Sequence, residues 1–91
     1  MRKLYRFHWD CGRMGDVTGL FVEDEDTIQR TLGSKVYFGE ILGKHSEICG
    51  TLTEDDLEIV SDDQDFINKL VDVLGASTIS GYNPLSYIED A

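Results

Sequence analysis

The residues best suited to chemistry in this sequence are its two histidines and two cysteines, which occur as two close pairs. His8 lies three residues before Cys11, and His45 lies four residues before Cys49. Two imidazole nitrogens and two thiolates form a donor set for tetrahedral zinc. However, neither pair has the two-cysteine spacing of a zinc knuckle, and a free cysteine usually behaves as a small buried hydrophobic residue. We therefore expect no metal and no other cofactor, and zinc held by these four residues stands as the alternative.

A nucleophilic enzyme site is the second chemistry that these residue types suggest. His45, Ser46 and Glu47 have the side chains of a catalytic triad, but they are consecutive in the sequence. Neighbouring residues of a strand point to opposite faces, so the three cannot reach one another as triad members do. The polar turn of a hairpin explains them better. We expect that the protein is not an enzyme.

Charge is distributed unevenly along the chain, and this is the clearest functional signal. The net charge is −10. Residues 1–46 contain seven basic and seven acidic side chains, whereas residues 47–91 contain one lysine and eleven acids. Such an acidic half repels nucleic acids and anionic membranes and attracts basic partners. A solvated face that keeps a small protein in solution is the competing explanation, but solubility does not require so complete a separation of charge.

We therefore predict a surface that binds a partner protein through acidic side chains. Its members are Glu54, Asp55, Asp56, Glu58, Asp62, Asp63, Asp65 and Asp72, together with Lys44, His45 and Glu47 of the hairpin turn. Exposed aromatic side chains are common in protein interfaces. The candidates for such exposure here are Trp9, Tyr37, Tyr82 and Tyr87.

The sequence predicts a single α+β domain that spans residues 1–91 without a linker. A hydrophobic fraction of 41% suffices for one modest core, and short connections favour an antiparallel sheet with one principal helix on one face. The expected order is strand 3–9, strand 17–22, helix 23–33, strands 35–42 and 47–52, strand 57–60, helix 61–75 and a docked tail. No apolar run is long enough for a membrane span or a signal peptide, which favours a cytoplasmic protein.

Alternation specifies the expected sheet in more detail. Tyr5, Phe7 and Trp9 share one face of the first strand and should point inward, while the basic residues on the outer face suit an exposed or an edge position. Gly19 interrupts the second strand and predicts a bulge or a close approach of two backbones. The hairpin of residues 36–52 is expected to form the centre of the sheet.

The second helix has the strongest local pattern in the chain. Ser61 and Gln64 match a capping box, and Gly75 ends the helix. A broad apolar stripe should cover one face of the sheet. It consists of Phe66, Ile67, Leu70, Val71, Val73 and Leu74.

These observations favour a non-enzymatic acidic module that docks on a basic surface of another protein and binds neither nucleic acid nor membrane itself. One such mode is mimicry of nucleic acid, in which the acids replace phosphates in the groove of a nucleic-acid-binding protein. In size and charge the chain is similar to small acidic inhibitors carried by phages and mobile elements, such as anti-CRISPR and anti-restriction proteins. That resemblance implies an anti-defence role.

A domain that binds a small molecule or a metal is the alternative function. It would use the turns Gly43–Glu47 and Cys11–Asp16, with Arg13, Glu40, Lys44 and His45 converging on one concave site. The acidic half of the chain has no place in this alternative.

Overall fold

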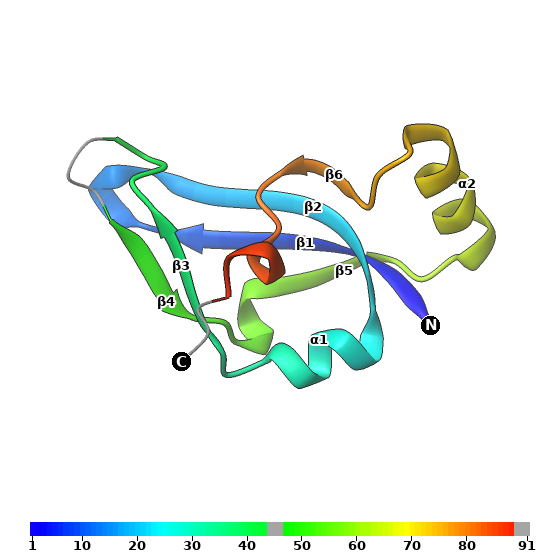
Figure 1. Cartoon of the computed structure of the whole chain (residues 1–91), viewed down its shortest axis with the longest axis horizontal. Helices are drawn as coiled ribbons and strands as arrows, with labels where there is room; N and C mark the ends of the chain where they lie inside the picture. The colour runs from blue at the N-terminus through cyan, green and yellow to red at the C-terminus, as the bar shows by residue number, and fades with distance from the viewer. Residues whose placement is uncertain (44–46, 89–91) are drawn as a thin grey trace.

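Two antiparallel sheets form the framework of the chain (Figure 1). The computed structural model describes residues 1–43 and 47–88. A four-stranded sheet has the order β5-β1-β2-β6, and a two-stranded sheet pairs β3 with β4. The elements are β1 (Arg2–Asp10), β2 (Asp16–Asp24), α1 (Glu25–Thr31), β3 (Lys35–Gly39), β4 (Ile48–Thr51), β5 (Leu57–Ser61), α2 (Gln64–Leu74) and β6 (Thr78–Gly81), with short 3-10 turns η1 (Gly12–Met14), η2 (Glu54–Asp56) and η3 (Pro84–Tyr87).

The α+β class and the order of the elements are confirmed, but the place of the central hairpin is corrected. Strands β3 and β4 do not join the larger sheet; they form a sheet of their own. Strand β1 takes the exposed alternative and not the edge position: Arg6 and His8 are exposed, but the strand pairs with both β2 and β5. The place of the hairpin has a physical cause. The hairpin buries a single apolar face, with Val36, Phe38 and Ile48 pointing inward, so it covers the larger sheet instead of extending it.

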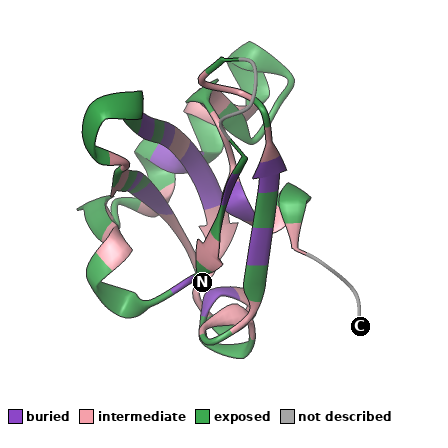
Figure 2. Cartoon of the chain, turned by 90° about the vertical axis from the view of Figure 1, so that its left-hand side faces the viewer, coloured by how far each residue is buried: buried purple, intermediate pink, exposed green. Residues whose placement is uncertain are grey.

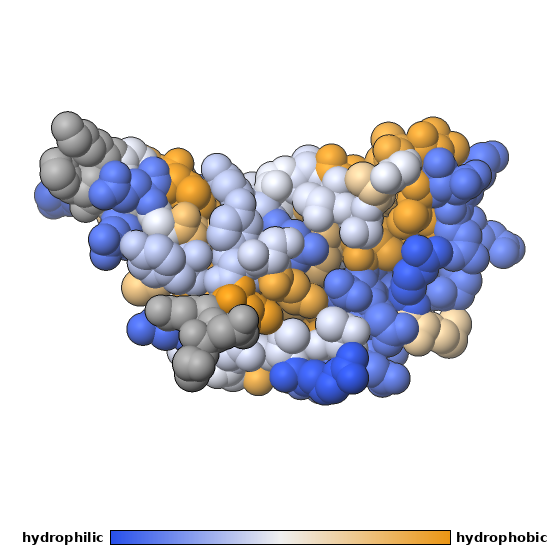
Figure 3. Space-filling model, in the orientation of Figure 1, coloured by the Kyte–Doolittle hydropathy of each residue, from blue (hydrophilic) through white to orange (hydrophobic). Residues whose placement is uncertain are grey.

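The apolar stripe of α2 is only partly covered, which contradicts the expectation that it is buried against the sheet. Ile67 alone is fully buried, and it packs with Leu4 and Val22 of the larger sheet. Phe66, Val73 and Leu74 remain 49%, 72% and 51% exposed. The buried residues of the chain lie mainly on strands (Figure 2). Apolar surface gathers over α2 at the upper right of the space-filling view (Figure 3).

The start of α2 also differs from the predicted capping box. Asp63, and not Ser61, is the N-cap: its carboxylate accepts hydrogen bonds from the backbone N–H groups of Asp65 and Phe66 at 3.1 and 3.3 Å. Ser61 is the last residue of β5, and its Oγ accepts from the Asp63 N–H at 3.2 Å. Gln64 ties the helix to the sheet, because its amide donates to the Arg2 carbonyl at 2.6 Å. Gly75 ends the helix in the left-handed conformation, as predicted.

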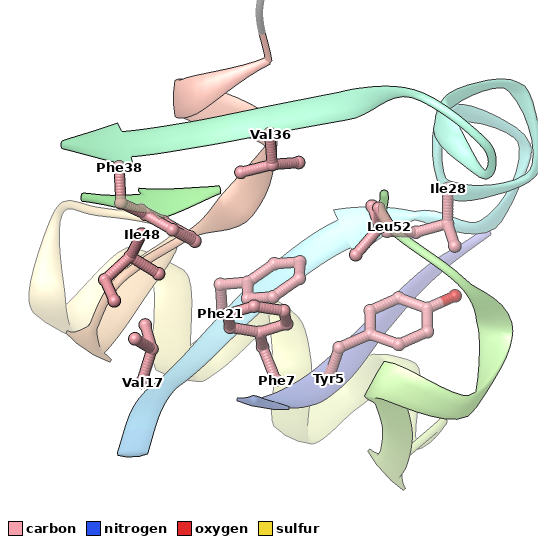
Figure 4. Close-up of a cluster of buried hydrophobic side chains, with 9 residues drawn as sticks. All are labelled: Tyr5, Phe7, Val17, Phe21, Ile28, Val36, Phe38, Ile48 and Leu52. Carbon is pink, nitrogen blue, oxygen red and sulfur yellow. The ribbon is translucent and has the colours of Figure 1, made fainter. Parts of the chain in front are cut away.

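The main core lies between the two sheets (Figure 4). Tyr5 and Phe7 point into it from β1, as the alternation predicts, and Trp9 is half-buried beside them. Phe21 of β2 stacks on Tyr5 with 5.9 Å between the ring centroids. Phe38 of β3 meets the edge of Trp9 at 5.5 Å, so the aromatic rings hold the smaller sheet against the larger one.

The C-terminal segment docks on this core, as predicted, and contributes the edge strand β6. Gly19 of β2 pairs with Gly81 of β6, and a side chain on Gly19 would place its Cβ 1.8 Å from the Tyr82 carbonyl oxygen. The close approach predicted at Gly19 is therefore present. Pro84 is buried at the start of η3, and Ile88 forms a bridge with Val36 of the smaller sheet.

Candidate protein-binding surface

Eight of the predicted acidic residues lie on or beside three consecutive elements, whereas Glu47 lies apart from them, beside Cys11. Glu54, Asp55 and Asp56 form η2, Glu58 lies on β5, and the rest of the eight surround or belong to α2. Strand β5 is an edge of the larger sheet, because only β1 pairs with it. The acids lie at the two ends of this strand, in η2 and around α2, with Glu58 between them, and Figure 1 shows β5 leading towards α2. The five residues of β5 alone extend about 17 Å at the usual rise of a strand.

Three of the eight acids have local structural partners. Asp56 closes a capping box at η2, since its Oδ2 accepts from the Thr53 backbone N–H at 2.9 Å. Asp63 caps α2 as described above. Glu58 faces Arg6 of the neighbouring strand, with 3.4 Å between Oε2 and the guanidinium nitrogen. Both side chains of this pair are mostly exposed, so it contributes little to stability.

The other five acids have no such partner. In the described ranges 1–43 and 47–88, their carboxylates form neither an ion pair nor a hydrogen bond, and all five side chains are exposed. We call them the open acids: Glu54, Asp55, Asp62, Asp65 and Asp72. Nothing in the local structure accounts for their charge, so they are the part of the predicted surface that remains available to a partner.

This division predicts that neighbouring aspartates differ in their effect on stability. Replacing Asp63 with alanine removes the N-cap of α2 and should lower the free energy of unfolding by about 1 kcal/mol. Replacing Asp62, which is exposed and caps nothing, should change it by less than about 0.5 kcal/mol. Urea denaturation followed by circular dichroism measures both. Equal losses in the two variants would mean that Asp63 is not the cap.

Acids of the charge-balanced first half join the same region, which the sequence analysis missed. Glu25 at the start of α1 and Glu54 in η2 line one hollow, together with Tyr5 of β1. Burial raises the pKa of the Tyr5 hydroxyl, and the charges of Glu25, Asp24 and Glu23 raise it further. The hollow thus has a negative electrostatic potential. The contact joins residues far apart in the chain, so no local pattern could have predicted it.

The exposed part of the α2 stripe lies beside the open acids. Phe66 and Val73 are seven residues apart and share the outer side of the helix. Asp65 and Asp72 directly precede them, so each acid lies about 100° further around the helix. We call Phe66, Val73 and Leu74 the apolar strip. Figure 3 shows hydrophilic surface next to the apolar surface of this helix. An apolar centre with a charged margin is the usual composition of a protein interface.

The three described residues of the zinc alternative, His8, Cys11 and Cys49, do not gather around one point. His8 lies on the outer face of β1, and its Nε2 is 3.0 Å from the Asp16 carboxylate. Cys11 and Cys49 are free thiols that line a common hollow of about 260 Å³, which His8 does not line. His45 lies outside the described residues. No three histidine, cysteine or acidic side chains of ranges 1–43 and 47–88 are grouped so that they could hold a metal.

Glu47, at the end of one turn of the alternative function, lies near Cys11 of the other, but the described charged residues Arg13 and Glu40 do not converge there. Glu47 lines the same hollow as Cys11, whereas Arg13 and Glu40 do not. Lys44 lies outside the described residues. Burial raises the pKa of the Cys11 thiol, and the charges of Asp16 and Asp10 add to that rise. A thiol kept protonated in this way is a poor nucleophile and a poor metal ligand.

The four aromatic residues expected at the surface divide into two pairs. Tyr37 and Tyr87 are exposed, whereas Trp9 and Tyr82 are half-buried against the main core. The negative charge of Glu47 raises the pKa of the Tyr37 hydroxyl, as do desolvation and a hydrogen bond to the same carboxylate. None of the four lines the hollow at Glu54, so they are not part of the acidic surface.

The fold and the surface together define a small α+β domain of two antiparallel sheets with an acidic edge. Comparisons of the chain with family models, with curated proteins and with solved structures found no match. Within the described residues, no helix is both long enough and apolar enough to cross a lipid bilayer.

Proposed function

We propose that the protein is a non-enzymatic binding module of the cytoplasm that docks on a basic surface of another protein. The observation that carries this proposal is the set of open acids at the two ends of β5, in η2 and at α2, which have no partner among the described residues. Carboxylates held near one another repel, and a cationic surface relieves that repulsion. Complementary charge also accelerates the encounter of two proteins.

The apolar strip supports a protein partner. Charged contacts at the rim of an interface contribute modestly, and most binding energy comes from a few buried anchors, among which aromatic residues are common. Phe66 is such an anchor, since it is 49% exposed and lies next to Asp65. A second copy of this chain would bring two acidic surfaces together at the strip. We therefore assign the strip to a basic partner and not to self-association.

Mimicry of nucleic acid is the mode of docking that we propose. The acids lie at both ends of the edge strand β5, with Glu58 between them, and continue onto α2, so the negative charge extends along one direction. A groove that binds a phosphate backbone recognises mainly such a line of charge, because phosphate contacts dominate its affinity. The partner would then be a nucleic-acid-binding protein, and docking would inhibit it, as an anti-defence protein does.

The structure decides which acids the test should change. Reversing Glu54, Asp55, Asp62 and Asp65 to lysine leaves the caps Asp56 and Asp63 in place. The tagged protein is used to capture partners from a lysate of its source at low and high salt. We expect the wild type to retain a basic protein at low salt and the reversed variant to retain at least about tenfold less, because steering by charge changes association by one to three orders of magnitude.

A matched control separates position from total charge. Reversing Asp62 and Asp65 alone should weaken capture. Reversing Asp16, at the turn of the β1–β2 hairpin, and Glu40, which follows β3, changes the net charge by the same amount on other elements and should leave capture unchanged. If both pairs weaken capture equally, only the net charge matters and there is no docking surface. If every reversed variant retains as much partner protein as the wild type, the proposal is contradicted.

A further inference from the structure

The hollow between α1 and β5 has the size of a pocket for one side chain. Its volume is about 180 Å³, below the roughly 300–1,000 Å³ of sites that enclose a cofactor or a drug-sized ligand. Its apolar floor includes Ile28 of α1 and Leu57 and Ile59 of β5, and its polar residues include Tyr5, Glu25 and Glu54. An apolar floor with acids at the margin suits a group that has a long apolar stem and a cationic end.

Tyr5 supplies a polar group that the fold itself does not use. The residue is 4% exposed, and its ring packs among the core side chains while its oxygen points away from Phe7 and Phe21 (Figure 4). In the described part of the chain, the Tyr5 hydroxyl has no hydrogen-bond partner. Every fully buried polar side-chain atom there does have one, so this hydroxyl is not fully buried. The hydroxyl therefore keeps contact with the hollow that it lines. A buried tyrosine normally satisfies its hydroxyl, and a ligand in this hollow would do so.

The two carboxylates complete the recognition. Glu54 is one of the open acids, and Glu25 is half-buried with one oxygen 3.2 Å from the Lys3 ammonium. Burial raises the pKa of the Tyr5 hydroxyl, and the nearby negative charges of Glu25, Asp24 and Glu23 raise it further, so the hydroxyl stays protonated. An anionic ligand is repelled by the resulting negative potential, and a neutral apolar one would offer no donor to the Tyr5 hydroxyl or to the Glu54 carboxylate.

We propose that this hollow receives an arginine side chain of the basic partner, with its stem against Ile59 and its guanidinium between Glu25, Glu54 and the Tyr5 hydroxyl. Arginine fits better than lysine because its five donors can serve several acceptors at once and because it is less strongly hydrated. This inference rests on the proposed function, since Glu54 belongs to both surfaces. The hollow is then the anchor point of the interface, and the open acids are its margin.

The pocket can be tested without the partner. The isotope-labelled protein is titrated with Nα-acetyl-arginine N-methylamide, and amide chemical shifts are followed by NMR. Single side chains bind weakly, so we expect saturable shifts at Ile28, Leu57 and Ile59 with a dissociation constant of the order of millimolar, measurable with probe up to about 50 mM. The citrulline analogue has nearly the same shape without the charge, and it should bind at least about fivefold more weakly.

Two variants locate the binding. Glu54→Gln keeps the shape of the side chain and should weaken the arginine probe about fivefold, because a charge-assisted hydrogen bond is lost. Glu40→Gln makes the same change away from the hollow and should have no effect. Tyr5→Phe removes only the hydroxyl and should also weaken the probe. Each variant is first shown to keep the wild-type spectrum outside the hollow.

The outcomes separate this inference from the proposed function. Absence of shifts at the hollow, equal binding of citrulline, or tighter binding of the matching lysine probe overturns the arginine pocket. If the pocket fails while reversal of the open acids still abolishes capture, only the pocket is wrong. If the arginine probe binds as expected but reversal leaves capture unchanged, the proposed function fails and the pocket stands.

Discussion

Replacing Phe38 with alanine is expected to lower the free energy of unfolding by about 3–5 kcal/mol, the usual cost of truncating a buried phenylalanine. Phe38 is 6% exposed and lies where the two sheets and the C-terminal segment meet. Its ring centroid is 5.9 Å from that of Phe7 and 4.8 Å from that of Tyr87. A chain of this length is typically stable by only about 5–14 kcal/mol, so the loss is a large fraction of the total.

The neighbouring residue provides the control for this truncation. Tyr37 belongs to the same strand but faces outward and is 43% exposed. Its replacement by alanine should cost less than about 1 kcal/mol, as expected for a surface position. Urea denaturation followed by Trp9 fluorescence measures both variants. Equal costs would contradict the assignment of the inner face of β3, and with it the packing of the smaller sheet on the larger.

Replacing Gly19 with alanine should have the second-largest effect on stability, about 3 kcal/mol, at the upper end of the usual cost of overpacking. The new Cβ would lie 1.8 Å from the Tyr82 carbonyl oxygen and 2.7 Å from its carbon. Both atoms belong to the backbone and cannot move aside by a change of rotamer. Strand β6 must therefore separate from β2, and the C-terminal segment should be released first.

Gly50 is the matched control, because its added Cβ meets a side chain and not the backbone. The nearest atom is in the Trp9 ring, at 3.3 Å. A small shift of this ring relieves the contact, so Gly50→Ala should cost less than about 1 kcal/mol. Hydrogen exchange of the β6 amides provides a second measurement. An alanine at position 19 that leaves both the unfolding energy and this exchange unchanged would show that β6 does not lie against β2.

Local pattern was sufficient to predict most of the elements. The alternation of Tyr5, Phe7 and Trp9 identified the first strand and its buried face, since strand periodicity depends only on the sequence. The cap of α1 is equally local, since the Asp24 carboxylate accepts a hydrogen bond from the Asp26 N–H at 2.9 Å. The glycine at position 19 was informative for a similar reason, because few other causes place a glycine inside a strand.

Tertiary contacts determined what the pattern could not predict. The amphipathic stripe of α2 showed that one side of the helix is apolar but not how much of it the sheet covers, and Phe66 and Val73 proved to be exposed. A short loop predicted that β3 and β4 pair, but not that they cover the larger sheet. The choice of Asp63 over Ser61 as the cap followed from the extra residue of β5, where Ser61 pairs with Leu4.

The sequence was sufficient to predict where the acids are concentrated in the chain, but not which of them stabilise local structure. Counting charges located the acids in the second half of the chain. It could not separate Asp56 and Asp63, which hold local structure, from the open acids, because that difference depends on single hydrogen bonds. Nor could it place Glu25 beside Glu54, because that contact requires the complete fold.

The central claim is that the open acids guide the protein to a basic partner. The most direct test is the association rate with the captured and purified partner, measured by stopped-flow between about 0.05 and 0.5 M salt, a range over which screening shortens from beyond 10 Å to a few ångströms. We predict that the wild-type rate falls at least about tenfold over this range, and that the variant reversed at Glu54, Asp55, Asp62 and Asp65 is slow throughout and nearly independent of salt. Equal rates for the two proteins at low salt would contradict the claim.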